Sequence, residues 1–132
     1  MKIRSAQKKD NDRILKILDE AGLRYPFEKL SNFWVAEKDG RILGVVRLED
    51  HPGFFFLTSL GVDPGQRNKG VAATLLKEVL NAADKPVYLY TIIPEFFKKF
   101  GFKIEPNPPQ LPPKEIYGCD ECFPGKCVVM KK

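Results

Sequence analysis

The segment from Leu60 to Ala72 contains the residues whose types and spacing could bind an anion. It runs from an apolar strand, through a polar turn that contains glycine, into an amphipathic helix. Such a connection points several backbone N–H groups and the positive end of a helix dipole at one place. Arg67 and Lys69 add positive charge, and Gly70 lets an anion approach the backbone closely. The segment predicts a phosphate or pyrophosphate site, with a plain strand-to-helix connection as the alternative.

Charge and motif content restrict the class of protein. The chain has 22 Lys and Arg against 17 Asp and Glu, a net charge of +5, which suits an anionic ligand. Its basic residues lie singly or in pairs, so we interpret them as a solvated surface and expect no nucleic-acid partner. The sequence has neither the Walker lysine pattern nor G-x-G-x-x-G, which disfavours nucleotide hydrolysis and a Rossmann site.

The hydrophobic pattern gives no sign of a membrane protein. No apolar run approaches the ~20 residues needed to span a bilayer. The N-terminus lacks the apolar stretch of a signal peptide. We therefore expect a cytoplasmic protein with no membrane partner.

The spacing of apolar residues predicts the elements around the anion site. A helix should start in the polar cluster 8–12 and end at Gly22, and further helices are predicted at 71–80 and 94–100. The Asp39-Gly40 pair and the residues 51–53 predict tight turns, which make two successive antiparallel hairpins. Strands are predicted at 2–6, 33–37, 41–49, 54–62, 87–91, 102–104 and 127–130. This order predicts an α+β or mixed α/β domain.

The anion-binding segment and a later block resemble the GNAT N-acetyltransferase family. Arg67-x-x-Gly70-x-Ala72 resembles the family signature R/Q-x-x-G-x-G/A, and Val-Asp-Pro at 62–64 resembles its strand end. Phe-Phe-Lys-Lys-Phe-Gly-Phe at 96–102 resembles the later F-Y-E-K-L-G-F block. The intervals between blocks and the element order over 2–104 also fit.

This resemblance implies an acyl-CoA N-acyltransferase fold. We expect a central, mostly antiparallel sheet of six to seven strands, flanked by three to four helices. The whole chain, 1–132, should form a single domain, with 105–132 as a Pro/Cys-rich C-terminal extension that ends in the last strand.

The resemblance also implies a binding mode for acetyl-CoA as co-substrate. The strands before and after the long helix should splay apart into a cleft for the thioester. The pantetheine arm should bind the backbone of Leu60, Gly61 and Val62. The pyrophosphate should bind a loop made of Arg67, Asn68, Lys69, Gly70, Val71 and Ala72. Phe97 stands where many family members have a tyrosine thought to protonate the leaving sulfur, which leaves the acid unassigned.

Acyl transfer to an amine requires an unprotonated amine, a polarised carbonyl and a leaving thiolate. A free thiol has a pKa near ~8.5, so a thiolate can leave without an acid. Tyr90 is a candidate donor, with an ordinary strand aromatic as the alternative. Glu49, through a water, and His51 are candidate bases, with a turn residue as the alternative for His51. Thr58 and Ser59 are expected to be packing or ladder residues.

The C-terminal segment resembles that of N-acetylglutamate-synthase-like amino-acid acetyltransferases. Those proteins have an L-P element before C-x-x-C and then F-P-x-x-C, as do residues 111–127 here. The resemblance implies a small-molecule amine acceptor such as glutamate. The carboxylates of such an acceptor require cations, for which the candidates are Arg24, Lys29 and Arg47, each with a solvated surface charge as the alternative.

Several alternatives stay open from the sequence. Reduced thiols in a loop are favoured over zinc binding, for which the ligands would be Cys119, Cys122 and Cys127. The acceptor could instead be a protein N-terminus or a lysine. The chain could also be a non-catalytic acyl-CoA-sensing module, and a homodimer is an open alternative to a monomer.

Overall fold

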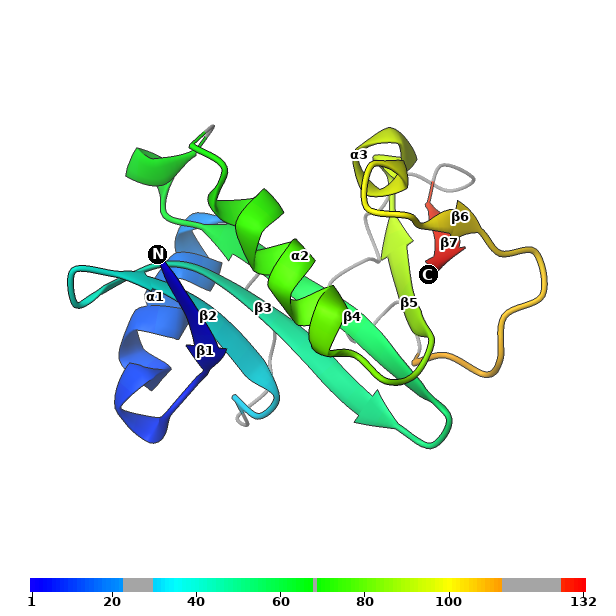
Figure 1. Cartoon of the computed structure of the whole chain (residues 1–132), viewed down its shortest axis with the longest axis horizontal. Coiled ribbons are helices and arrows are strands. Elements are labelled where there is room, and N and C mark those ends of the chain that lie inside the picture. Colours follow the sequence, from blue (N-terminus) through cyan, green and yellow to red (C-terminus); the bar gives the residue numbers. More distant parts are fainter. Residues whose placement is uncertain (23–29, 68, 113–126) are drawn as a thin grey trace.

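Within the described residues, one seven-stranded sheet organises the chain, and β4 and β5 are its only parallel neighbours (Figure 1). The computed structural model describes residues 1–22, 30–67, 69–112 and 127–132. The strand order is β1-β2-β3-β4-β5-β7-β6, and the other neighbouring pairs are antiparallel. The strands are β1 (Lys2–Ser5), β2 (Phe33–Lys38), β3 (Arg41–His51), β4 (Phe54–Val62), β5 (Val87–Thr91), β6 (Lys103–Ile104) and β7 (Val128–Lys131).

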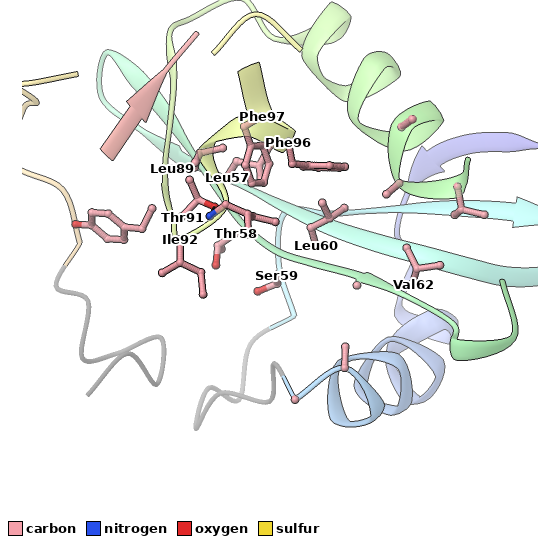
Figure 2. A pocket seen from close by; sticks show the side chains of 18 of the residues that line it. Leu57, Thr58, Ser59, Leu60, Val62, Leu89, Thr91, Ile92, Phe96 and Phe97 are labelled. Atoms are coloured by element: carbon pink, nitrogen blue, oxygen red, sulfur yellow. The ribbon is translucent and has the colours of Figure 1, made fainter. Parts of the chain in front are cut away.

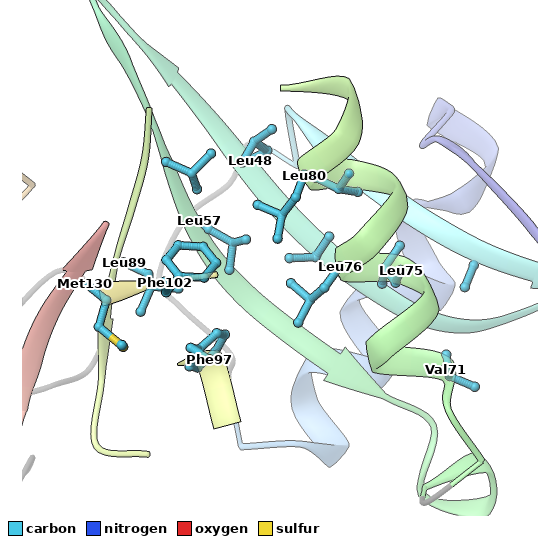
Figure 3. Close-up of a cluster of buried hydrophobic side chains, with 14 of the residues drawn as sticks. Leu48, Leu57, Val71, Leu75, Leu76, Leu80, Leu89, Phe97, Phe102 and Met130 are labelled. Atoms are coloured by element: carbon cyan, nitrogen blue, oxygen red, sulfur yellow. The ribbon is translucent and has the colours of Figure 1, made fainter. Parts of the chain in front are cut away.

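The helices cover both faces of this sheet. Within the described residues they are α1 (Asn11–Glu20), α2 (Val71–Ala82) and α3 (Pro94–Lys98), with short 3-10 turns η1 (Lys8–Asp10) and η2 (Pro64–Gln66). The α2 and α3 side chains join one large apolar cluster (Figure 3). The α1 side chains join a separate cluster. Neighbouring residues of β3 alternate between the two clusters, so α1 lies on the opposite face from α2 and α3.

The expected elements are all present, and only their ends differ. β3 continues through His51, so the second hairpin turn is shorter than the predicted 51–53. α3 ends at Lys98 rather than at residue 100. Asp39 and Gly40 both have positive φ, 52° and 78°, as a tight hairpin turn requires. The expected α+β fold with a mostly antiparallel sheet is confirmed.

The pairing between β3 and β4 is irregular near the middle of β4. One residue of β3 lies between Val45 and Arg47, but two residues of β4, Ser59 and Leu60, lie between their partners. This is a β-bulge, which bends a strand and increases its local twist. Ser59 has a φ of 59°, which is unusual for a residue with a side chain.

The bend in β4 is followed by its separation from β5. Parallel pairing between the two strands is confined to Phe55 with Val87 and Phe56 with Tyr88. Beyond Phe56 the strands separate, and the edge of β4 that faces β5 has no strand beside it. A gap therefore opens at the centre of the sheet, between the ends of two adjacent strands.

A glycine sets how closely α2 approaches the sheet. Gly44 on β3 is buried, and a Cβ atom added to it would lie 2.8 Å from Cγ1 of Val71. Val71 is the first residue of α2 and is 4% exposed. Because real Cβ contacts are longer than this, the absence of a side chain at Gly44 lets the start of α2 sit directly on β3.

We expect Gly44→Ala to displace the first turn of α2 and to lower the free energy of unfolding by about 1–3 kcal/mol, as overpacking does. Urea denaturation measures this change. Gly65→Ala is the matched control, because an added Cβ there meets only an ordinary contact, 3.4 Å from Asp63. Equal stability of the two variants would contradict the tight docking of α2.

Candidate active site

The separated ends of β4 and β5 line a cavity of about 810 Å³ (Figure 2). Residues of β4 from Phe56 to Val62 form one wall, and Leu89 to Thr91 of β5 form the other. The start of α2 closes one end, and Phe96 and Phe97 of α3 lie alongside. We refer to this space as the β4–β5 cavity.

The two sides of the cavity differ in chemistry. Leu60, Val62 and Phe96 pack with the apolar cluster under α2 and α3. Figure 2 shows Leu60 and Phe96 on one side of β4 and Ser59 on the other. Tyr90 belongs to an aromatic cluster around Phe56 on the α1 face, separate from the cluster under α2. One side is thus apolar, and the other offers hydroxyl groups.

The start of α2 has the properties of an anion site. Gly70 is its N-cap, with a φ of 78° and no side-chain cap hydrogen bond. Its carbonyl accepts the first helical bond, from Thr74 N–H at 3.0 Å. The N–H groups of the first turn have no partner within a helix, so those of Val71 and Ala72 are available to a ligand at the cavity wall.

Most of the residues expected at the phosphate loop lie together at this end of the cavity. Arg67, Gly70, Val71 and Ala72 line it, as do Leu60, Gly61 and Val62 on the strand. Lys69 is exposed and is not one of the lining residues, and Asn68 lies outside the described residues. Gln66 also lines this end; its position next to Arg67 is the only signal in the sequence.

An ion pair from α1 fixes the turn that leads into the phosphate loop. The Asp63 carboxylate accepts the Gly65 N–H at 2.8 Å and pairs with the Arg13 guanidinium. Arg13 also donates to the Ile42 carbonyl at 3.2 Å, and Asp63 N–H donates to the Leu43 carbonyl at 2.8 Å. The Gly65 N–H and then Arg13 hold the pKa of Asp63 below its ordinary value. Spacing in the sequence gave no sign of this pair.

A second ion-pair cluster anchors α1 itself. The Arg4 guanidinium on β1 donates to Asp10 at 2.8 and 3.1 Å and to Glu37 on β2 at 2.6 Å. Asp10 is buried and also accepts the Gln7 N–H at 2.7 Å. The bond from Arg4 is the largest cause of the lowered pKa of Asp10. Through these contacts the start of α1, and with it Arg13, is held against the sheet.

The two aromatic residues singled out from the sequence have clear structural roles. Phe97 is 8% exposed and makes edge contacts with Phe96 and Phe102, with ring centroids 5.0 and 5.8 Å apart. Its edge reaches the cavity, but it has no group that could donate a proton. The Tyr90 hydroxyl donates to the Pro112 carbonyl at 2.6 Å, so this candidate donor is engaged by a backbone group.

The candidate base residues form one row on β3. Arg47 Nη1 lies 3.1 Å from Glu49 Oε2, and Glu49 Oε1 lies 2.6 Å from His51 Nε2. Arg47 Nε also donates to the Ser31 carbonyl at 3.0 Å, and the His51 ring stacks on Phe54. The structure brings Arg47, Glu49 and His51 together on the α1 face, one strand away from the cavity. Arg24 and Lys29 lie outside the described residues.

Within the described residues, no cluster of His, Cys, Asp or Glu could hold a metal ion. Cys127 lines the cavity, but Cys119 and Cys122 lie outside the described residues, so the zinc alternative stays a prediction. The described part of the chain contains no helix long and apolar enough to span a membrane.

Comparison with known proteins identifies the family. A model of the acetyltransferase (GNAT) domain matches residues 29–104, more than half of the chain. The chain belongs to the GNAT acetyltransferase family. It is therefore an acyltransferase by family. The resemblance to the GNAT family noted at Arg67-x-x-Gly70-x-Ala72 is confirmed for the family as a whole.

Solved structures of GNAT proteins have the same fold across nearly the whole chain. Rv2747 from Mycobacterium tuberculosis, crystallised with CoA, is 20% identical, with a TM-score of 0.76 over 99% of this chain and 98% of that one. N-acetylglutamate synthase from Neisseria gonorrhoeae, complexed with coenzyme A and N-acetyl-glutamate, is 19% identical, with a TM-score of 0.73 over 99% of this chain and 34% of that one. Arabidopsis thaliana Naa50, with the bisubstrate analogue CoA-Ac-MVNAL, is 19% identical, with a TM-score of 0.65 over 99% and 97%.

We expect Asp63→Asn to loosen the turn before the predicted phosphate loop. The change should raise the KM for acetyl-CoA about 3- to 10-fold and cost about 1–2 kcal/mol of stability at neutral pH. The lowered pKa of Asp63 means that the carboxylate stabilises the fold above its ordinary pKa of 3.8. That stabilisation is lost as the pH falls through the lower folded-state pKa.

Urea unfolding of wild type and Asp63→Asn across acidic pH measures how the stabilisation by Asp63 changes with pH. The stability difference should be constant between about pH 7 and about pH 5 and should shrink below about pH 4. The exposed Asp84 provides a control, Asp84→Asn. A difference that grows on acidification would contradict the assignment.

Proposed function

We propose that the chain transfers an acetyl group from acetyl-CoA to a primary amine of a small molecule, with a glutamate-like amino acid as the preferred acceptor. The observation that carries this proposal is the β4–β5 cavity, which ends on the uncapped N-terminus of α2. An elongated thioester with a pyrophosphate at its far end matches a cavity with an apolar middle and an anion site at one end. The related structures crystallised with CoA support the same ligand.

In this proposal the pyrophosphate lies at the start of α2. The first-turn N–H groups and the helix dipole bind it, and Arg67 adds a charged donor. The pantetheine arm runs along the free edge of β4, bonds to the backbone of Leu60, Gly61 and Val62, and so takes the place of the missing strand. Phe97 contributes an apolar wall beside the thioester rather than an acid.

The acetyl group is positioned where β4 and β5 begin to separate. The amine attacks the carbonyl carbon, the C–S bond breaks, and coenzyme A leaves as a thiolate. Because a thiol has a pKa near ~8.5, this leaving group is stable enough without a proton donor. The engagement of the Tyr90 hydroxyl with Pro112 is compatible with a reaction driven by positioning.

Glu49 is the base that we propose for the amine proton. It lies on the α1 face, between Arg47 and His51. From there it could take the proton through a water bound between Glu49 and the amine. Arg47 next to it provides a cation for an acceptor carboxylate. The match of the C-terminal segment to N-acetylglutamate-synthase-like enzymes favours an amino acid as acceptor.

A second candidate function is acetylation of a protein N-terminus. The observation that favours it is the likeness to Naa50, which was crystallised with a peptide-containing bisubstrate analogue. The exposed Ile92 and Ile93, 47% and 55% accessible at the rim of the cavity, could contact an apolar peptide residue.

Thiol release from acetyl-CoA, measured over a panel of free amino acids and short peptides, tests the function. We expect glutamate to give the highest kcat/KM. Arg67→Ala should raise the KM for acetyl-CoA about tenfold through loss of a charged phosphate contact. Lys77→Ala, at an exposed position on α2, should leave it unchanged. Acetyl-CoA binding without thiol release for any amine would instead identify a sensing module.

We expect Glu49→Gln to reduce kcat/KM about 10²- to 10⁴-fold at neutral pH, because a general base contributes on that scale. The activity lost should return in part at alkaline pH, where more of the free amine is unprotonated. His51→Gln serves as the comparison, since it removes the neighbour but keeps Glu49. A Glu49→Gln rate equal to wild type at every pH would remove Glu49 as the base.

A further inference from the structure

The bulge residue Ser59 combines two unfavourable features at the cavity wall. Its side chain is buried, with the residue 5% exposed, and its Oγ has no hydrogen-bond partner within the described part of the chain. Its backbone has a φ of 59°, in the left-handed region that favours glycine. A buried polar group without a partner is costly, and so is a left-handed φ at a residue with a side chain.

Other residues at position 59 would avoid these two costs, so the presence of a serine suggests a function for its hydroxyl. Glycine at this position would relieve the backbone, and alanine would remove the unpartnered hydroxyl. The expectation from the sequence was a packing or ladder residue, but Ser59 sits where the ladder with β3 is interrupted. Strained residues and unsatisfied polar groups concentrate at binding sites, where a ligand supplies the missing contact.

The other hydroxyl groups along the middle of the cavity are already engaged. Thr91 Oγ1 accepts the Ile93 N–H at 2.9 Å. The Tyr90 hydroxyl donates to the Pro112 carbonyl, and Thr58 has a partner as well. Within the described part of the chain, Ser59 therefore contributes a buried hydroxyl at the cavity wall that has no hydrogen-bond partner.

The direction of Ser59 indicates which substrate it meets. Leu60, Phe96 and the phosphate site at α2 make up the side assigned to acetyl-CoA. Figure 2 shows Ser59 pointing to the opposite side of β4. Thr58, the residue before Ser59, is the cross-strand partner of Arg47 on β3. A nucleophile must approach the carbonyl from a side that the cofactor does not fill, and this is the side that Ser59 faces.

We propose that Ser59 Oγ accepts a hydrogen bond from the unprotonated primary amine of the acceptor and so orients its lone pair toward the thioester carbon. This inference rests on the proposed function and names the acceptor-binding group within it. As the N–C bond forms and the C–S bond breaks, the electron pair leaves with the coenzyme A sulfur. The amine proton passes to the base. Ser59 holds the amine and is neither nucleophile nor base.

The test is the joint effect of Ser59→Ala on stability and on kinetics. Removal of an unpartnered buried hydroxyl should raise Tm by about 3–5 °C. The KM for the amine should rise about tenfold through loss of one hydrogen bond, with the KM for acetyl-CoA unchanged. Ser59→Gly should raise Tm further, because it also relieves the backbone, and should raise the amine KM equally. Ser5→Ala, at an exposed serine on β1, is the control and should change neither.

Three outcomes would overturn the inference. A fall in Tm for Ser59→Ala would mean that the hydroxyl has a structural partner. An unchanged amine KM in an active protein would remove Ser59 from the acceptor site and leave the proposed function intact. A wild-type chain that binds acetyl-CoA but releases no thiol with any amine would overturn the proposed function, and this role of Ser59 with it.

Discussion

The separation of β4 from β5 is the constraint on which the rest of the structure depends. Parallel pairing stops at Phe56, although both strands continue. Both strands stay anchored beside the gap, because Leu57 of β4 and Leu89 of β5 pack into the cluster that contains Phe97 and Phe102 (Figure 3). A sheet edge in the middle of a domain is thereby preserved for a ligand, where a regular sheet would have used it for pairing.

The anion site at the end of this gap is positioned from both faces of the sheet. On one face, the missing side chain of Gly44 lets Val71 and the start of α2 rest on β3. On the other face, Arg13 of α1 reaches Asp63 at the end of β4. The polar turn therefore begins and ends at residues whose positions are fixed by contacts with β3 and α1. The proposed phosphate site is therefore positioned by elements that are distant in sequence.

The sequence predicted the elements well because their signals are local. Apolar spacing, the Asp39-Gly40 turn and the Arg67 to Ala72 signature each depend on neighbours within one turn or strand. The bulge at Ser59 depends on the register between two strands, which no local pattern specifies. The Arg13–Asp63 pair joins residues 50 positions apart in the sequence, so the local pattern around each residue indicates only a surface charge. The row of Arg47, Glu49 and His51 requires β3 to extend through His51, two residues beyond the predicted strand end.

In the proposed reaction, the thiolate and the amine proton are released on different faces of the gap. The thiolate forms on the side of Leu60 and Phe97, where the cofactor arm leads back to the positive end of α2. The proton forms on the side of Ser59, where Glu49 lies 2.6 Å from His51, and the His51 side chain is 27% exposed to solvent. Negative charge and proton thus leave in opposite directions across β4. In the proposed reaction, the bulged strand β4 thus separates the cofactor side of the cavity from the acceptor side.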